Sequence, residues 1–236
     1  MTATAKRLHE RIMDALIITI DGPAGSGKST AARNLAKALG IAFLDTGATY
    51  RAAALKVIRA GVSLDDSGAI AQAVRDADIR LESDPAGVTV HLDGQDVTGD
   101  IRLAIASETA SRIAGIPAVR QVLVELQRKI ARQLGSFVSE GRDQGSVVFP
   151  DARVKFYVIA SPQVRAQRRL EEMVGRGEQA SLDEILQSIL QRDTRDSTRA
   201  SSPLIKPADA IEVDTSGRTA QDVMAELLCH VEARCK

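Results

Sequence analysis

Short apolar runs alternate with amphipathic stretches along most of the chain. Leu16–Ile20 is a β-branched run typical of a buried parallel strand. Apolar residues at 31, 32, 35, 36 and 39 then have helical spacing, and Gly40 is suited to end that helix. Further runs predict four more strands, at Ile41–Leu44, Phe137–Glu140, Val154–Ile159 and Ala210–Asp214. This alternation predicts an α/β fold, a five-stranded parallel sheet with helices on both faces.

The helices between these strands carry recognisable end signals. We expect helices over about 49–60, from Asp65 or Asp66 to about 77, over about 103–114 and over 117–134, where Pro117 suits the first turn. Ser161-Pro162 opens another helix, which breaks around Gly175-Arg-Gly177. Ser181-Leu-Asp-Glu184 predicts a capping box that opens a helix to about 196, and Thr219-Ala-Gln-Asp222 caps the last one.

One segment changes to a period of two residues. Asp78–Glu82 and Val88–Leu92 alternate, and Asp93-Gly94 is a hairpin signal before Gln95–Val97. We therefore expect a small antiparallel sheet, inserted over about 78–100 into the α/β pattern.

A glycine-rich loop joins the first strand to the first helix. It reads G-x-x-x-x-G-K-[ST] and comprises Gly22, Pro23, Ala24, Gly25, Ser26, Gly27, Lys28, Ser29 and Thr30. Backbone N–H groups in such a loop converge on a phosphate, the lysine reaches the β- and γ-phosphates, and the hydroxyl after it holds Mg²⁺. The alternative is an ordinary glycine turn. Strand, lysine, hydroxyl and helix together favour a nucleoside triphosphate site.

Composition narrows the class of partner. Lys+Arg and Asp+Glu are both 31, which argues against a general nucleic-acid or membrane-surface partner. Cys229 and Cys235 have neither metal-site nor redox spacing, so we expect free thiols and a cytoplasmic protein. Residues 1–14 are polar, without a signal-peptide pattern, and we expect them to form a dispensable tail.

Arginines gather in the second half of the chain. Arg165, Arg168, Arg169 and Arg176 bracket the Gly175–Gly177 break, and Arg192, Arg195 and Arg199 share one helical face. A solvated helix face and a plain surface loop are the simpler interpretations. Phosphoryl transfer between two anionic substrates, however, needs several guanidiniums and a flap that excludes water. Because the P-loop, Asp45–Gly47 and Gly141–Asp143 each follow a strand, we expect them to line one cleft.

Several motifs in this order resemble the bacterial cytidylate kinase family. They are Ile18–Lys28, Leu44–Ala48 with Tyr50-Arg51, Asp93–Val97, Gly141–Asp143 with Val147–Ala152, and Arg192-Asp-x-Arg-Asp-Ser-x-Arg199. The resemblance implies transfer of the ATP γ-phosphate to CMP or dCMP with Mg²⁺. It also implies a core over 15–45, 112–163 and 200–236, an NMP-binding domain over 46–111 and a lid over 164–199. We expect a monomer whose partners are small-molecule nucleotides.

The resemblance also implies roles for individual residues. Gly22 to Thr30 would bind ATP, with Ser29 as the metal ligand. Lys28, Arg142, Arg168 and Arg199 would be catalytic. The acceptor CMP would be bound by Thr46, Arg51, Ser111, Arg120, Arg142, Asp143, Arg192, Asp196 and Arg199. Asp21 and Asp45 are candidates for ordering waters around the metal, ranked below Ser29 as direct ligands.

Three residues depart from the family pattern. Thr49 stands where a large apolar residue is expected, and Gln144 and Ser146 replace a more apolar residue and a threonine. All three adjoin proposed acceptor contacts, so they leave fine substrate preference open. A UMP or AMP kinase, a P-loop kinase for a small metabolite and a non-catalytic nucleotide switch are the alternatives.

Asp143 gives a direct test of acceptor choice. A carboxylate accepts from the exocyclic amino group of cytosine and repels the carbonyl oxygen that uracil has there. Asp143→Asn should therefore narrow the preference for CMP over UMP, measured as the ratio of kcat/KM values. An unchanged ratio would refute this role.

Overall fold

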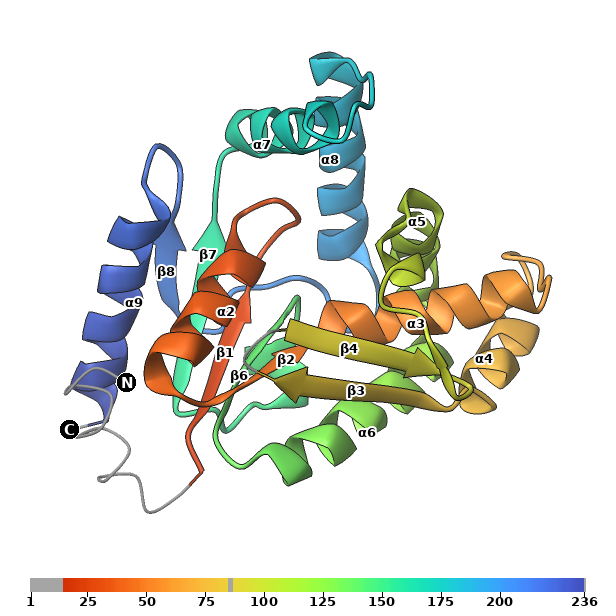
Figure 1. Ribbon diagram of the computed structural model, residues 1–236, viewed down its shortest axis with the longest axis horizontal. Coiled ribbons are helices and arrows are strands. Elements are labelled where there is room, and N and C mark those ends of the chain that lie inside the picture. The colour runs from red at the N-terminus through yellow and green to blue at the C-terminus, as the bar shows by residue number, and fades with distance from the viewer. Residues whose placement is uncertain (1–14, 85–86, 236) are drawn as a thin grey trace. The chain divides into compact units, whose positions relative to one another are not determined.

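The computed structural model describes residues 15–84 and 87–235, so the tail expected over 1–14 lies outside the described residues. Figure 1 shows the five strands of the main sheet, whose order is β2-β6-β1-β7-β8. They are β1 (Ile17–Asp21), β2 (Ala42–Asp45), β6 (Phe137–Gly141), β7 (Val154–Ile159) and β8 (Ile211–Asp214). Parallel pairing aligns Ile18 of β1 with Val154 of β7, and Phe156 of β7 with Ile211 of β8. The five predicted strands and the parallel sheet are confirmed.

The helices follow the predicted order. They are α2 (Lys28–Leu39), α3 (Thr46–Arg59), α4 (Ser67–Arg75), α5 (Ala104–Ile113), α6 (Pro117–Leu134), α7 (Pro162–Val174), α8 (Leu182–Thr198) and α9 (Ala220–Arg234). A 3₁₀ turn spans Asp100–Arg102, and a short π-helical turn spans Gln144–Val148. The helix α3 begins at Thr46 rather than near Thr49, because the Asp45 side chain accepts from the Ala48 N–H and caps it earlier.

Of the two predicted capping boxes, the structure contains one. At α9 the predicted capping box is confirmed, since Thr219 and Asp222 exchange side-chain and backbone hydrogen bonds. At α8 the predicted box is wrong. Ser181 stands at the N-cap, but its side chain makes no cap hydrogen bond. The acidic residues Asp183 and Glu184 in the first turn favour this helix start through the helix dipole instead.

The predicted antiparallel insertion is confirmed. Strands β3 (Ile79–Asp84), β4 (Gly87–Leu92) and β5 (Gln95–Asp96) form it in that order. Asp93 and Gly94 join β4 to β5 with φ values of 51° and 80°, as a hairpin turn with two positive φ angles requires.

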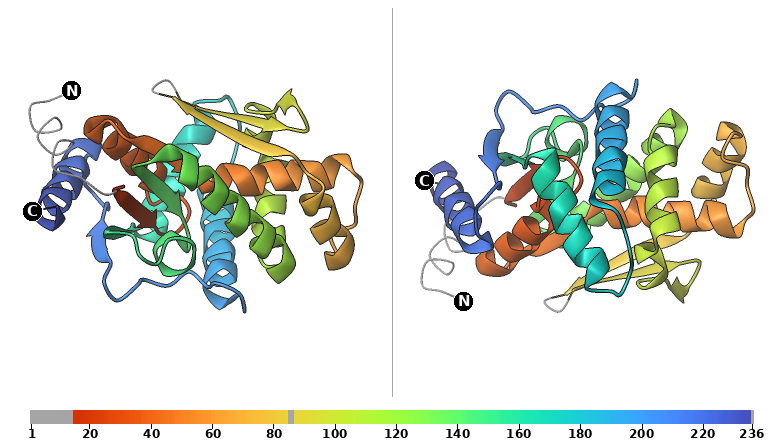
Figure 2. Two further views of the ribbon diagram at one scale, coloured as in Figure 1. Left: turned by 90° about the horizontal axis from the view of Figure 1, so that it is seen from below. Right: turned by 90° about the horizontal axis from the view of Figure 1, so that it is seen from above.

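The chain divides into two compact units. One contains residues 15–41 and 138–235, and the other contains 42–137. In the first, α2 packs against α9 beside the strands (Figure 2). In the second, α3 packs against α4, α5, α6 and β4 around an apolar core that includes Ala52, Val57, Ile70, Leu92 and Leu123. The second unit contains the expected NMP-binding segment 46–111 together with β2 and α6, and the functional domain limits stay a prediction.

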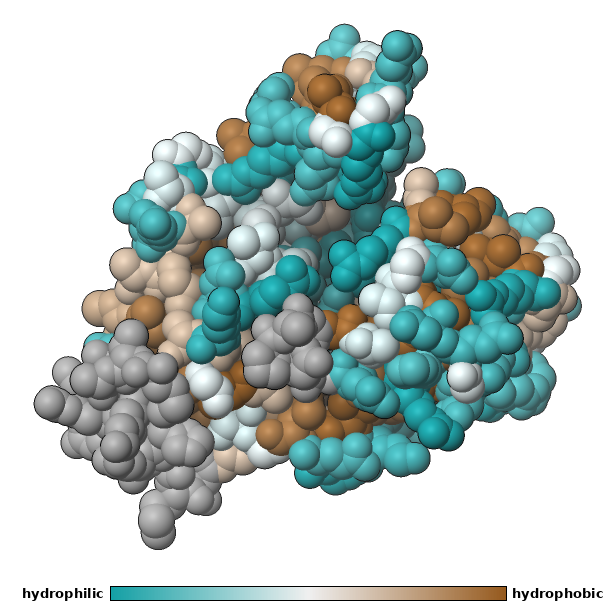
Figure 3. Space-filling view, viewed as in Figure 1, coloured by the Kyte–Doolittle hydropathy of each residue, from teal (hydrophilic) through white to brown (hydrophobic). Residues whose placement is uncertain are grey.

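Ion pairs join α3 to the insertion within the second unit. Lys56 Nζ lies 2.6 Å from Asp93 Oδ2, and Arg59 Nη2 lies 2.9 Å from Asp100 Oδ2. Exposed large hydrophobic side chains gather at the start of α5, with Leu103 and Ile105, and on α7 and α8, with Val174 and Leu182 (Figure 3). Within the described ranges, no helix combines the length and apolar character needed to cross a membrane.

Two of the departures from the family pattern have buried polar partners. Thr49 Oγ1 accepts a hydrogen bond of 3.0 Å from Gln127 Nε2 and donates one of 2.7 Å to the Thr46 carbonyl. Gln144 Oε1 accepts one of 2.8 Å from Ser139 Oγ. All four of these side chains are buried. Thr49 and Gln144 are therefore tolerated because each is hydrogen-bonded inside the protein.

Asp21 holds the loop after β6 against the end of β1. Its Oδ1 accepts from the Gln144 N–H and its Oδ2 from the Gly145 N–H, each at 2.8 Å. Burial raises the pKa of this carboxyl from 3.8 to about 7, and the two amide hydrogen bonds oppose that rise. Asp21 thereby positions the segment that carries Arg142 and Asp143.

The pair of Thr49 and Gln127 predicts a pattern of unfolding free energies. Thr49→Val leaves the buried Gln127 amide without this partner and should lower the free energy of unfolding by ~1–3 kcal/mol. Adding Gln127→Leu removes the stranded amide and should recover most of that loss. Urea denaturation of both single variants and the double variant measures this. Additive losses in the double variant would contradict the pairing.

Asp21 predicts a pH dependence of stability. Between pH 3.8 and about 7 the folded protein binds this proton and the unfolded chain does not. The contribution of Asp21 to the free energy of unfolding therefore falls as the pH rises through that window. The stability of the wild type relative to Asp21→Asn should fall by up to ~1.4 kcal/mol per pH unit there. Other groups titrate in both proteins, so their contributions cancel in this difference. A difference in unfolding free energy that does not change with pH would contradict the raised pKa of Asp21.

Candidate active site

The P-loop has the predicted context of strand, loop and helix. It leaves β1 after Asp21, and α2 begins at Lys28. Gly25 and Gly27 have φ values of 76° and 83°, which L side chains rarely adopt. Glycine is needed at position 22 for a different reason, because a Cβ there would lie 2.0 Å from the Val158 carbonyl oxygen. The first glycine is thus required by the close approach of β7.

Lys28 is buried in the first turn of α2. Its Nζ lies 3.3 Å from the Pro23 carbonyl oxygen and 3.9 Å from Glu140 Oε2. The pKa of Lys28 is lowered from 10.5 to about 7, chiefly by burial and then by the positive charge of Arg142, against the opposing effect of Glu140. An anion bound beside this ammonium group would stabilise its charge.

Glu140 is a site residue that the sequence analysis missed. It stands near the end of β6, and its Oε1 accepts a hydrogen bond of 2.7 Å from Ser29 Oγ. Asp21, by contrast, has both oxygens engaged by backbone amides. A serine hydroxyl beside a carboxylate offers the oxygen donors that Mg²⁺ prefers, and Mg²⁺ commonly takes only one or two protein ligands beside substrate phosphates. Ser29 and Glu140 therefore fit a magnesium site.

A second group of predicted residues surrounds Asp196 on α8. Arg142 Nε donates to Asp196 Oδ2 at 2.9 Å. Burial opposes ionisation of Asp196, but the charges of Arg142, Arg192 and Arg199 hold the pKa of this carboxyl below its usual value. The charges of Arg142, Arg192 and Asp196 also act on Lys28. The first unit thus brings the predicted acceptor-binding residues Arg142, Arg192 and Asp196 into one electrostatic cluster with the P-loop lysine.

Asp143 occupies the start of the turn after β6. Its side chain is buried, and its carbonyl oxygen accepts from the N–H groups of Val147 and Val148. The turn 144–148 and the clamp from Asp21 hold this residue next to Arg142 in the chain. Its reading of cytosine stays a prediction.

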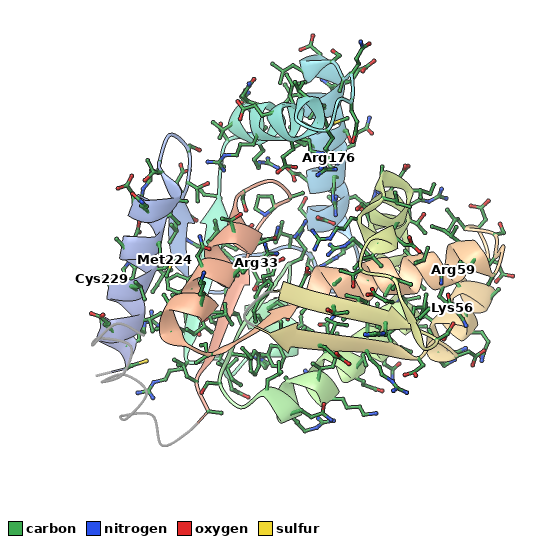
Figure 4. The ribbon with its side chains drawn as sticks, viewed as in Figure 1. Arg33, Lys56, Arg59, Arg176, Met224 and Cys229 are labelled. Atoms are coloured by element: carbon green, nitrogen blue, oxygen red, sulfur yellow. The ribbon has the colours of Figure 1, made fainter. Side chains whose placement is uncertain are left out.

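The arginines of the expected lid have different positions. Arg168 donates to Thr215 Oγ1 at 3.0 Å and to the Thr215 carbonyl at 2.8 Å, while Thr215 Oγ1 lies 2.9 Å from the Ser26 carbonyl. Arg168 therefore lies beside the P-loop, held by a threonine that sequence reasoning missed. Arg176 is exposed near the turn between α7 and α8 (Figure 4). Arg165, in the expected lid segment, is buried.

The second unit holds its own group of predicted site residues. Asp45 Oδ2 binds Arg51 Nη2 at 3.0 Å. Thr46, the first residue of α3, is buried. A Cβ at Gly47 would lie 2.9 Å from Arg51 Nη1, so the glycine leaves room for Arg51 to fold back onto Asp45. Asp45 is therefore engaged in capping α3 and holding Arg51.

The remaining predicted acceptor contacts are on α5 and α6. Ser111 and Arg120 are both buried. The guanidinium carbon of Arg120 lies 5.9 Å from the centroid of the Tyr50 ring, within cation–π range. Tyr50 thus helps to orient Arg120. That this group and the P-loop group line one cleft stays a prediction.

Comparison with known proteins assigns the family. A sequence profile of the cytidylate kinase family matches residues 18–233. The cytidylate kinase of Caldanaerobacter subterraneus subsp. tengcongensis is 47% identical over 88% of this chain and 90% of that protein. The cytidylate kinase of Pelotomaculum thermopropionicum is 46% identical over 92% and 96%.

A solved structure shows the same fold. It is an uncharacterized protein from Eubacterium ventriosum, which superposes with a TM-score of 0.53 at 13% identity and covers 92% of this chain and 98% of that one. The profile match extends from β1 to α9 and includes the P-loop, Glu140 and the cluster around Asp196. The chain therefore belongs to the cytidylate kinase family.

Proposed function

We propose that this protein transfers the γ-phosphoryl group of ATP to CMP or dCMP, giving ADP and CDP or dCDP. The observation that carries the proposal is the cluster in the first unit. Lys28 is buried at the P-loop, and the charges of Arg142 and Arg192 act on it. A site built this way favours polyanionic ligands, because bound phosphates offset the mutual repulsion of these cations.

The donor side of the reaction rests on the P-loop. Its backbone N–H groups and Lys28 would hold the β- and γ-phosphates, where the transition state develops charge. Mg²⁺, held by Ser29 with Glu140 beside it, would neutralise charge on the donor phosphates. Arg168 lies close to Gly27, since a Cβ at that glycine would be 3.6 Å from Arg168 Nη1. This position suits a guanidinium that binds a donor phosphate.

The acceptor side rests on guanidiniums with anchored geometry. Arg142 is held by Asp196, and Arg51 is held by Asp45. With Arg199 they would bind the acceptor phosphate, while Arg192 and Asp196 contact the sugar. Ser111, Arg120 and Asp143 would read cytosine, and the Thr46 segment would contact the nucleotide. A phosphate acceptor is already anionic, so the reaction needs positioning and charge stabilisation rather than an obligatory general base.

The setting of the reaction follows from its substrates. We propose a cytoplasmic enzyme of pyrimidine nucleotide metabolism, acting as a monomer on small-molecule nucleotides. Equal numbers of basic and acidic residues, 31 of each, support small-molecule partners over nucleic acid or a membrane surface.

An acceptor screen tests this proposal. ADP release is measured with ATP and Mg²⁺ in the presence of CMP, dCMP, UMP, AMP or no acceptor. We expect the rate to rise strongly with CMP and dCMP. A larger rise with UMP or AMP would identify a different nucleotide kinase. Release that no acceptor increases would point to an ATPase or a switch.

Glu140 predicts a specific magnesium phenotype. Glu140→Gln keeps an oxygen for the Ser29 hydroxyl but removes the negative charge near the metal. The Mg²⁺ concentration for half-maximal rate should rise at least ~10-fold, and kcat should fall by ~10–100-fold. The matched control is Glu212→Gln, which neutralises an exposed carboxylate paired with Lys206. A Mg²⁺ dependence like that of the control would show that Glu140 does not serve the metal.

A further inference from the structure

Arg165 is a buried arginine that the proposed reaction does not use. It lies in the first turn of α7, and only 3% of its surface is exposed. Its Nε donates to the Ala160 carbonyl at 2.9 Å, just after β7. Full burial of a guanidinium is costly unless its donors are paired. The partners of Arg165 therefore show which parts of the protein this residue joins.

One partner is the P-loop itself. Arg165 Nη1 donates to the Ala24 carbonyl at 3.1 Å. The aliphatic stem packs against the next residue, because a Cβ built at Gly25 would lie 3.3 Å from Arg165 Cβ and 3.6 Å from Cγ. A side chain at position 25 would crowd the arginine. The middle of the P-loop thus rests on Arg165.

The other partner is α8. Arg165 Nη1 and Nη2 bind the two carboxylate oxygens of Asp193 at 3.1 and 2.6 Å, a bidentate pair that fixes orientation as well as distance. Asp193 lies between Arg192 and Asp196, the proposed sugar contacts of the acceptor. A single guanidinium therefore links the donor loop to the helix that carries acceptor contacts.

This link constrains motion. A shift of α8 relative to the P-loop would break charge-assisted hydrogen bonds of a buried guanidinium, whose loss is costly when no water replaces them. Arg165 therefore restrains movement of α8 relative to the P-loop. A rearrangement of the P-loop at Ala24 would therefore act on Asp193 and, through α8, on Arg192 and Asp196.

We propose that Arg165 and Asp193 form a positioning pair that couples ATP binding at the P-loop to acceptor binding at α8. The proposed function gives neither residue of the pair a contact with a substrate. Occupancy of the P-loop raises the affinity for the acceptor nucleotide, and the acceptor raises the affinity for ATP by the same factor, as linkage requires. This inference rests on the proposed function, because it takes α8 as part of the acceptor site.

A purely structural pair would behave differently. Loss of a structural contact lowers stability and weakens both ligands without changing how one affects the other. Loss of a coupling contact reduces the ratio of the two acceptor affinities, measured with and without donor. That ratio separates the two roles even where overall affinity also falls.

The experiment measures the Kd of CMP by calorimetry with the full chain and Mg²⁺, alone and with a saturating non-hydrolysable ATP analogue. For the wild type we expect the analogue to tighten CMP binding at least ~5-fold, within the usual range of coupling between sites. Asp193→Asn and Arg165→Met should bring this ratio to about 1–2, reflecting loss of the bidentate pair. The double variant should go no further than the stronger single variant, since both residues act through one contact.

A control variant and the contradicting results complete the experiment. Lys206→Met, which breaks an exposed pair with Glu212, should keep the wild-type ratio. Asp193→Asn is isosteric and keeps an oxygen acceptor, so it carries the test if Arg165→Met does not fold. A wild-type ratio near 1, or an unchanged ratio in Asp193→Asn, overturns the coupling while leaving the proposed function intact. No CMP binding by the wild type overturns the proposed function and the coupling with it.

Discussion

The site depends on keeping Lys28 and several arginines close together inside a protein. Like charges at this spacing repel, and burial adds to the cost of the ammonium form, as the lowered pKa of Lys28 shows. Carboxylates held at fixed positions offset part of this repulsion. Glu140 lies beside Lys28, and Asp196 binds Arg142. The compensation is partial, so the site is preorganised for phosphates without being neutralised before they arrive.

Acidic side chains at fixed positions also hold the loops around the site. Asp21 holds the turn that carries Arg142 and Asp143, and Asp193 holds Arg165 under the P-loop. The polar substitutions Thr49 and Gln144 fit this arrangement, because Gln127 and Ser139 supply their hydrogen bonds. Two of the three departures from the family pattern, Thr49 and Gln144, are thus accommodated by hydrogen bonds to buried side chains.

Local signals predicted the strands, the P-loop, the Asp93-Gly94 hairpin and the order of the helices, because each depends on neighbouring residues. Contacts between distant residues were not predictable in this way. Glu140 is 111 positions from Ser29, and Asp21 is 123 from Gln144. The burial of Arg165 against the P-loop is likewise beyond local signals, because helical spacing does not reveal which face of a helix packs against a distant loop. Ser181 failed as a capping-box residue because the motif specifies side chains but not their hydrogen bonds.

We infer that this charge arrangement directs a phosphoryl group to a second nucleotide rather than to water. The most direct measurement follows the label from γ-³²P-ATP in the presence of CMP and Mg²⁺ and identifies the labelled product. We expect the label in the β-phosphate of CDP, with little inorganic phosphate. Label recovered as inorganic phosphate, with CMP unchanged, would contradict it.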